Sequence, residues 1–165
     1  MTVLADSLRP CGPVADPKAA ERTHEVLSQT ADKGGWRGRL DAAWPALAPV
    51  FGASPYLSGL ARRWPAMLGD LLAADADERF ADILARTAAA GGLGSDEAGA
   101  ELRRLKAETH LLTALADLGG VWDLDAVTGA LTHFADAALG AALQAVAHAE
   151  VAAGRLQAVG TGPAG

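Results

Sequence analysis

The sequence predicts an all-α fold, an irregular multi-helix bundle formed as one domain. Of the 165 residues, 50% are hydrophobic but 5% are aromatic, and the apolar residues are mostly alanine and leucine, with few β-branched side chains. This composition favours helix over strand. Apolar residues also recur at intervals of three and four, and glycines and prolines separate the periodic segments. A chain of this length and hydrophobicity can bury a sizeable core.

Three parts are expected along the chain. Residues 1–15 should form a flexible N-terminal arm, residues 16–154 the helical domain, and residues 155–165 a glycine-rich linker. The helical domain begins at Asp16 and Pro17, an N-cap followed by proline at the first helical position. Further helix starts of the same local kind are expected at Ser54 with Pro55, at Pro65, at Asp75, at Ser95 and at Asp123.

Two prolines predict that the segment 36–51 is broken into short helical pieces. Pro45 and Pro49 each remove a backbone hydrogen bond and clash with the preceding turn of a helix. After that segment the order improves, and the helix that starts at Ser54 is expected to end at Trp64, because the residue before a proline disfavours the helical conformation.

The last two helices are the longest. One should run from Ser95 to about Leu118 and present the apolar seam Leu102, Leu105, Thr109, Leu112 and Ala116. The other should follow Asp123 and bury the stripe Leu124, Val127, Leu131, Phe134, Ala138, Ala142, Ala145 and Ala149. Its segment 126–149 is apolar enough to suggest a membrane span, but the central Asp136 disfavours insertion, and a buried helix of a soluble protein is expected.

Charge and cysteine content exclude several classes of function. The formal net charge is -6 and the pI is about 5.1, which repels a phosphate backbone, so no nucleic-acid partner is expected. Cys11 is the single cysteine and can form no intrachain disulfide, which is typical of a reducing compartment. The first residues carry Asp6 and Arg9 instead of a secretion signal. A cytoplasmic protein without a membrane partner is predicted.

No residue set in the sequence completes a catalytic, cofactor-binding or metal site. Gly94-Ser95-Asp96 has the Gly-Ser start of a nucleotidyltransferase metal motif, but lacks two carboxylates one residue apart on a strand, so a helix start is the better interpretation. His133 and Asp136 share one helical face without a third ligand. An autonomous metal enzyme that uses this pair remains a weaker hypothesis.

Other polar residues give equally incomplete patterns. The serines Ser54, Ser58 and Ser95 have no adjacent base, and the histidines His24, His110 and His148 are interpreted as isolated surface or interface residues. The basic residues Arg62, Arg63, Arg103, Arg104 and Lys106 could contact a phosphate or an acidic partner. The favoured interpretation is a solvated helix face, on which Arg104 pairs with Glu101 and Glu108 at helical spacing.

Two segments resemble a known family. One is Phe51–Pro65, with a Ser-Pro start, a hydrophobic helix and an Arg-Trp-Pro end. The other is Leu102–Gly120 with its arginine-rich helix and Asp-Leu-Gly turn, continuing through the Val-Thr of residues 127–128 to the Ala-Asp of residues 135–136. Together they are similar to the N-terminal region of the bifunctional glutamine synthetase adenylyltransferase and adenylyl-removing enzymes. The resemblance covers roughly residues 36–150, and none of its motifs is catalytic.

The resemblance implies a function that lies largely outside this chain. Such enzymes are similar to two polymerase-β-type nucleotidyltransferase domains flanking helical regions, one attaching AMP from ATP to a tyrosine of glutamine synthetase and the other removing it by phosphorolysis. The Asp-x-Asp motif of the first such domain is absent here. The chain is therefore expected to be the N-terminal helical scaffold before that domain, inactive alone, with ATP and Mg²⁺ as cofactors and glutamine synthetase and a PII-type protein as partners of the whole enzyme.

A second hypothesis belongs to a different class. The chain could instead be a stand-alone helical protein-interaction module without enzymatic activity, in which the alanine-rich last helix provides the docking surface. The sequence does not decide whether Arg103 or Arg104 contacts a nucleotide, or which face meets a partner.

Overall fold

Every regular element between residues 2 and 157, the part of the chain that the computed structural model describes, is helical. The all-α prediction is confirmed for these residues. The elements in chain order are α1 (Leu4–Ser7), α2 (Pro17–Gly34), α3 (Arg37–Ala53), α4 (Pro55–Arg63), α5 (Pro65–Ala73), α6 (Ala76–Ala89), the 3₁₀ turn η1 (Ala90–Gly92), α7 (Ser95–Leu118) and α8 (Leu124–Ala152).

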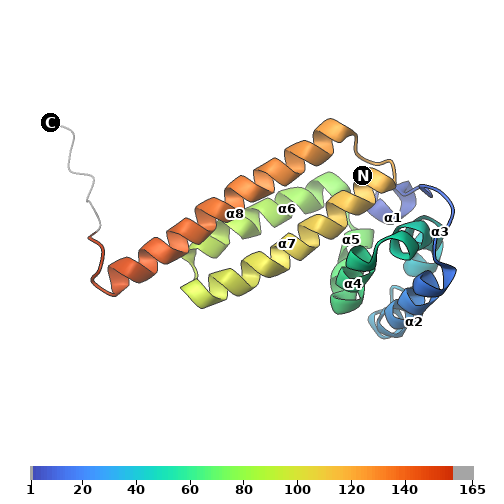
Figure 1. Cartoon of the computed structure of the whole chain (residues 1–165), viewed down its shortest axis with the longest axis horizontal. Helices are drawn as coiled ribbons and strands as arrows, with labels where there is room; N and C mark the ends of the chain where they lie inside the picture. Colours follow the sequence, from blue (N-terminus) through green and yellow to red (C-terminus); the bar gives the residue numbers. More distant parts are fainter. Residues whose placement is uncertain (1, 158–165) are drawn as a thin grey trace.

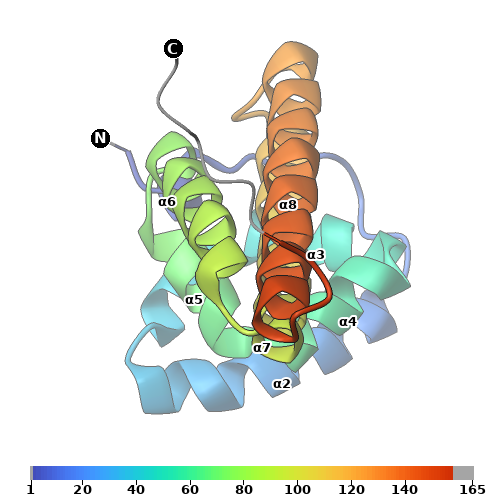
Figure 2. The ribbon, with the colours of Figure 1, turned by 90° about the vertical axis from the view of Figure 1, so that its left-hand side faces the viewer.

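The helices form two groups that share α7. Helices α6, α7 and α8 pack against one another as an elongated three-helix bundle, while α1 to α5 gather around the C-terminal half of α7 (Figure 1). Figure 2 shows α2 crossing beneath the long helices at a steep angle. The C-terminal end of α8 reaches beyond the N-terminal end of α7 (Figure 1). Of the expected linker, residues 155–157 are described, and residues 158–165 lie outside the described part.

One continuous apolar core joins the two groups. It is built mainly from leucines of α3, α5 and α7, with Phe51 from the C-terminal turn of α3 and Ile83 from α6. Leu105 and Leu112 of the predicted α7 seam are fully buried, as are Thr109 and Ala116, whereas Leu102 is half-buried. The seam prediction therefore holds for most of its members.

Local capping sets the helix starts as the sequence predicts. The side chains of four N-cap residues accept hydrogen bonds from backbone N–H groups of the first turn: Asp16, Ser54, Asp75 and Asp123. Each satisfies donors that the helix itself leaves unpaired. At the other end of α2, Gly35 takes a left-handed conformation with φ of 71°, which glycine adopts without steric cost.

The start of α7 differs from the prediction. Gly94 is the N-cap, and Ser95 is the first residue of the helix and makes no capping hydrogen bond. The carboxylates of Asp96 and Glu97 lie in the first turn instead, where the positive end of the helix dipole favours negative charge.

The prediction of short helical pieces over 36–51 is wrong, because α3 is continuous through Pro45 and Pro49. Each interior proline costs about 3 kcal/mol. Four large apolar side chains of this helix are almost completely buried: Leu40, Leu47, Val50 and Phe51. At about 1.5–3 kcal/mol for each buried side chain, this burial offsets the cost of the two prolines.

The expected irregular arm is anchored in the core. Residues Leu4–Ser7 form α1, and the Leu4 side chain is 1% exposed. Its backbone N–H donates to the carbonyl of Ala74 at 2.7 Å, and the N–H of Arg9 donates to the carbonyl of Gly119 at 3.0 Å. A four-residue helix carries too few residues to show periodicity, so the sequence alone did not reveal it.

The prediction for α8 is wrong in its depth and holds in part for its face, because Phe134 and Ala145 of the predicted stripe are buried and Ala138 packs against the core. The structure buries Ala130, Phe134, Ala141 and Ala145, whereas the predicted inner residues Leu124 and Leu131 are 73% and 41% exposed. Among residues 2–157, α8 alone has the length and hydropathy that a membrane-crossing helix needs, which is weak evidence because core helices share both. Only 22% of its most apolar window is buried, so it is a surface helix of the fold.

Candidate functional site

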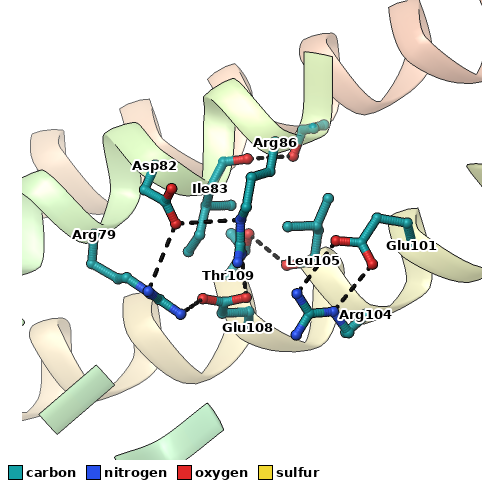
Figure 3. Close-up of polar contacts among 10 residues, drawn as sticks. Arg79, Asp82, Ile83, Arg86, Glu101, Arg104, Leu105, Glu108 and Thr109 are labelled. Atoms are coloured by element: carbon teal, nitrogen blue, oxygen red, sulfur yellow. Dashed lines mark hydrogen bonds and ion pairs between the residues drawn. The ribbon is translucent and has the colours of Figure 1, made fainter. Parts of the chain in front are cut away.

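A buried carboxylate marks the interface of α6 and α7. Glu108 points from the middle of α7 towards α6 and is completely excluded from solvent. A carboxylate in such a position is strongly destabilising unless cations reach it. Two arginines of α6, Arg79 and Arg86, lie seven residues apart and so on one face of that helix, and both turn their guanidinium groups to Glu108 (Figure 3).

The two arginines contact both oxygens of Glu108, one through a hydrogen bond and the other through an ion pair alone. Nη2 of Arg86 donates a hydrogen bond to Oε2 at 2.5 Å. Nη2 of Arg79 lies 2.5 Å from Oε1 and forms an ion pair that lacks hydrogen-bond alignment. Asp82 lies between the two arginines, 3.3 Å from Nε of Arg86 and 3.7 Å from Nη1 of Arg79. Two cations thus balance two carboxylates, so the cluster is neutral as a whole.

The sequence interpretation missed this cluster. Glu108 was assigned to a solvated face with Arg104, but it lies three residues after Leu105 and four before Leu112, on the buried side. A carboxylate on an apolar stripe was the available indication that a neighbouring helix must supply cations. The other half of the prediction is confirmed, because Nε of Arg104 donates to Oε2 of Glu101 at 3.1 Å. This contact raises the pKa of Arg104 above its usual value.

Two adjacent hollows open along the N-terminal half of α7, one towards the α4–α5 junction and the other towards the end of α6 and the η1 turn. The first, here called the arginine hollow, has a volume of about 390 Å³ and is lined by Arg63, Arg103, Arg104 and Trp64 together with Leu60 and two alanines. The second, the apolar hollow, has about 550 Å³. Its walls are mostly apolar, and it shares Trp64, Ala100 and Arg104 with the first hollow.

The three arginines of the arginine hollow differ in their contacts. Arg104 is paired with Glu101, and Arg63 stacks over the indole ring of Trp64 with its Cζ 5.6 Å from the ring centroid. Within the described residues, no carboxylate lies within 4.0 Å of the Arg63 or Arg103 guanidinium group or of the Lys106 amine. These unpaired cations are the ones that the sequence analysis named as possible contacts for a phosphate or an acidic partner.

The histidines are less isolated than the sequence suggests. Nδ1 of His110 lies 2.6 Å from the hydroxyl of Tyr56, which joins α7 to α4. Burial, with a smaller contribution from the positive charge of Lys106, lowers the pKa of His110 below its ordinary value. Nε2 of His24 lies 3.2 Å from Oδ1 of Asp41. His148 is exposed on α8.

The remaining sequence candidates do not converge on a catalytic arrangement. His133 and Asp136 are both exposed on α8. Ser58 is buried, and its hydroxyl donates to the carbonyl of Pro55 at 3.1 Å. Between residues 2 and 157, no group of three or more His, Cys, Asp or Glu side chains is placed to hold a metal ion.

Fold and side chains together define the class of the chain, an all-α helical module stabilised by a buried interhelical ion cluster. Its sequence then places it more narrowly. The family model for glutamate-ammonia ligase adenylyltransferase matches residues 44–162. The chain is also 56% identical, over its full length, to a bifunctional glutamine synthetase adenylyltransferase/adenylyl-removing enzyme of Caulobacter vibrioides. The chain belongs to the glutamate-ammonia ligase adenylyltransferase family.

Further relatives with the same name support this assignment. The enzyme of Xanthobacter autotrophicus is 40% identical over 93% of the chain, and that of Rhodopseudomonas palustris strain BisB5 is 42% identical over 67%. The aligned segments make up 17%, 16% and 11% of the Caulobacter, Xanthobacter and Rhodopseudomonas proteins. The chain thus spans about a sixth of the Caulobacter relative. No solved structure gives a significant match.

Proposed function

We propose that this chain acts as the leading helical scaffold of a glutamine synthetase adenylyltransferase/adenylyl-removing enzyme, and that it supports a nucleotidyltransferase domain encoded after it. The observation that carries the proposal is the full-length identity of 56% to an enzyme of which the match covers 17%. In this proposal, adenylyl transfer, ATP, Mg²⁺, the substrate glutamine synthetase and any PII-type regulator belong to the whole cytoplasmic enzyme.

The exposed side of α8 is the surface that we assign to the rest of the enzyme. Leu131, Ala135, Leu139, Leu143 and Val146 follow one another at intervals of three or four and so share one face of the helix, here called the α8 stripe. Its large residues Leu139, Leu143 and Val146 are 62%, 63% and 51% exposed. Contiguous apolar surface of this kind is typical of an interface.

The position of the α8 stripe supports the rest of the enzyme as the partner that covers it. The stripe lies on α8, the last helix of the described residues, and the matched segment makes up 17% of the Caulobacter relative. Its helix extends past the neighbouring helices (Figure 1), so a following domain can fold back on it without displacing the core. The alanines between the large residues permit close approach of a partner element.

The experiment compares charged substitutions in this chain and in the enzyme of family length. Leu139→Glu combined with Leu143→Glu places charges on the α8 stripe, and His133→Glu combined with His148→Glu places the same charges at exposed positions outside it. In this chain alone, both pairs should leave the helix content and unfolding midpoint nearly unchanged. In the longer enzyme, the stripe pair alone should lower the thermal stability and the rate of adenylylation of glutamine synthetase.

Two outcomes contradict the proposal. One is a reading frame that continues past residue 165 without an Asp-x-Asp motif within the next domain length, roughly 100 residues. The other is equal behaviour of the two variant pairs in the longer enzyme. A chain that is monomeric, stable and active in binding without any following domain would favour the stand-alone interaction module instead.

A further inference from the structure

The arginine hollow and the apolar hollow differ in chemistry although they adjoin each other. The arginine hollow has three guanidinium groups and no carboxylate among its lining residues. The apolar hollow is lined by Leu93, three alanines and the shared Trp64, and by two arginines and two glutamates whose charges balance, Arg86, Arg104, Glu97 and Glu101. A ligand that fills both must present anionic groups on one side and an apolar group on the other.

The concentration of cations is unusual for this chain. The chain as a whole carries a formal net charge of -6, yet the guanidinium groups of Arg63 and Arg103 lie near each other without a carboxylate partner in the described part of the chain. Lys106 extends the same side of α7 towards His110, because it lies three residues after Arg103 and four before His110. Guanidinium groups bind carboxylates with paired, directional hydrogen bonds.

The stacking of Arg63 on Trp64 adds a second feature. An arginine held over an indole ring is already partly ordered, so it loses less side-chain entropy when it binds an anion. Trp64 itself is shared by both hollows, so one indole contacts the anionic and the apolar part of the same ligand. Tryptophan and arginine are the residues most often found at the centre of protein interfaces.

From this arrangement we infer that the two hollows together form a docking site for a polypeptide segment of a partner protein, in which carboxylates stand beside an apolar side chain. The carboxylates contact Arg63 and Arg103, and the apolar side chain enters the apolar hollow against Trp64 and Leu93. The lining of the arginine hollow carries three positive charges, whereas the two arginines and two glutamates that line the apolar hollow balance each other, and this difference fixes the direction in which the segment lies. The site is lined by residues of α4, α6, η1 and α7, together with Trp64 and Leu93, and does not depend on the function proposed above.

The shape of the site favours a polypeptide over a small anion. The hollows extend along α7 from Glu97 to Ala107, ten residues that span about 15 Å at the helical rise of about 1.5 Å per residue. An extended peptide covers this distance with about five residues, at about 3.3 Å for each. A compact anion would occupy the arginine hollow and leave the apolar hollow empty.

The test uses the full chain and a fluorescein-labelled peptide in which pairs of glutamates alternate with leucine, with fluorescence anisotropy as the readout. We expect saturable binding of this peptide. A peptide with lysine in place of glutamate should not bind, and one with serine in place of leucine should bind about tenfold more weakly, the loss expected for one well-buried apolar side chain.

Two chain variants localise the binding. Arg63→Gln combined with Arg103→Gln should weaken binding at least about tenfold, because each removes a charge-assisted contact. The matched control, Arg22→Gln combined with Arg39→Gln, removes two exposed arginines elsewhere and should leave the affinity unchanged. A third variant, Ala100→Glu, introduces a carboxylate at an exposed position shared by both hollows and should also prevent binding while α7 stays helical.

Several results would overturn the inference: no binding of the glutamate–leucine peptide, equal binding of the lysine peptide, or equal loss in the two double-arginine variants. A competition experiment with small anions tests whether the site binds a polypeptide or a small anion. If ATP or citrate displaces the peptide and binds as tightly as the peptide does, the site recognises a small anion and the polypeptide assignment is wrong. Circular dichroism and urea unfolding of each variant show that altered binding does not come from altered folding.

Discussion

Nη2 of Arg86 lies 2.5 Å from Oε2 of Glu108, although 22 residues separate them in the chain. This contact, together with that of Arg79, allows a carboxylate to sit at 0% exposure between two helices. The cluster links α6 to α7 (Figure 3). Its energetic role is open to direct measurement, as are the contributions of the caps, a close glycine contact and a histidine.

Replacing Glu108 by glutamine should destabilise the chain by about 2 kcal/mol. Removal of one partner from a buried ion pair costs about 3–5 kcal/mol, and the value is lower here because Arg79 and Arg86 are 20% and 29% exposed and can be hydrated. The control Glu101→Gln breaks a half-exposed pair and should cost under about 1 kcal/mol. Urea unfolding followed by circular dichroism measures both. Equal costs for the two variants would show that burial of Glu108 contributes nothing special.

Substituting Ser54 by alanine should cost about 1 kcal/mol of stability. The Ser54 hydroxyl accepts a hydrogen bond from the backbone N–H of Leu57 at 3.2 Å and caps α4. Ser95 offers a matched control, since it also lies at a helix start but makes no capping bond. Ser95→Ala should therefore be nearly neutral in the same unfolding measurement. A Ser95 variant as unstable as the Ser54 variant would mean that the assigned N-cap of α7 is wrong.

Two glycines inside short helices should respond to alanine in opposite ways. A Cβ at Gly69 would lie 2.8 Å from Cε2 and 3.0 Å from Cδ2 of Trp36, so alanine there must displace the indole and should destabilise the chain. At Gly59 a Cβ would meet nothing within 4 Å. Gly59→Ala should stabilise the chain by about 0.5–1 kcal/mol through the helix propensity of alanine. Thermal unfolding of both variants measures the two stability changes. Tryptophan fluorescence follows the displacement of Trp36 in the Gly69 variant.

His110 should make the stability of the chain depend on pH below about 6.5, the pKa of histidine in an unfolded chain. Burial, then the charge of Lys106, lowers its pKa in the fold, so the folded state favours neutral imidazole. This stabilising contribution is complete above about pH 6.5 and is lost as the pH falls through the lower folded-state pKa, because the unfolded chain then binds the extra proton.

An NMR titration of the His110 ring protons measures that pKa directly, with His110→Gln used to assign the resonance. Lys106→Gln should raise the pKa part of the way towards its ordinary value, because burial, the larger cause, remains. The urea-unfolding free energy of the unmodified chain should decrease on going from neutral to mildly acidic pH by more than that of His110→Gln. A His110 pKa at or above 6.5 would contradict the prediction.

The contrast between Asp123 and Leu124 shows what local sequence determines. The start of α8 at Asp123 was predictable, because a cap bond joins the carboxylate to the backbone of Ala126 three residues later. The same is true of Asp16, Ser54 and Asp75. The buried side of α8 was predicted only in part, at Phe134 and Ala145, because an alanine- and leucine-rich helix is apolar on several sides, and its burial depends on where α6 and α7 lie.

The sequence by itself determined the all-α class, the places where most helices start and end, and the resemblance to one enzyme family. These features depend on hydrogen bonds and spacings within a few residues, or on motifs that can be read directly in the sequence. Only the tertiary structure decided the partners of Glu108, the continuity of α3 through its prolines and the meeting of Arg63 with Arg103. Each of these depends on the free energy of contacts between segments far apart in the chain, which local patterns do not specify.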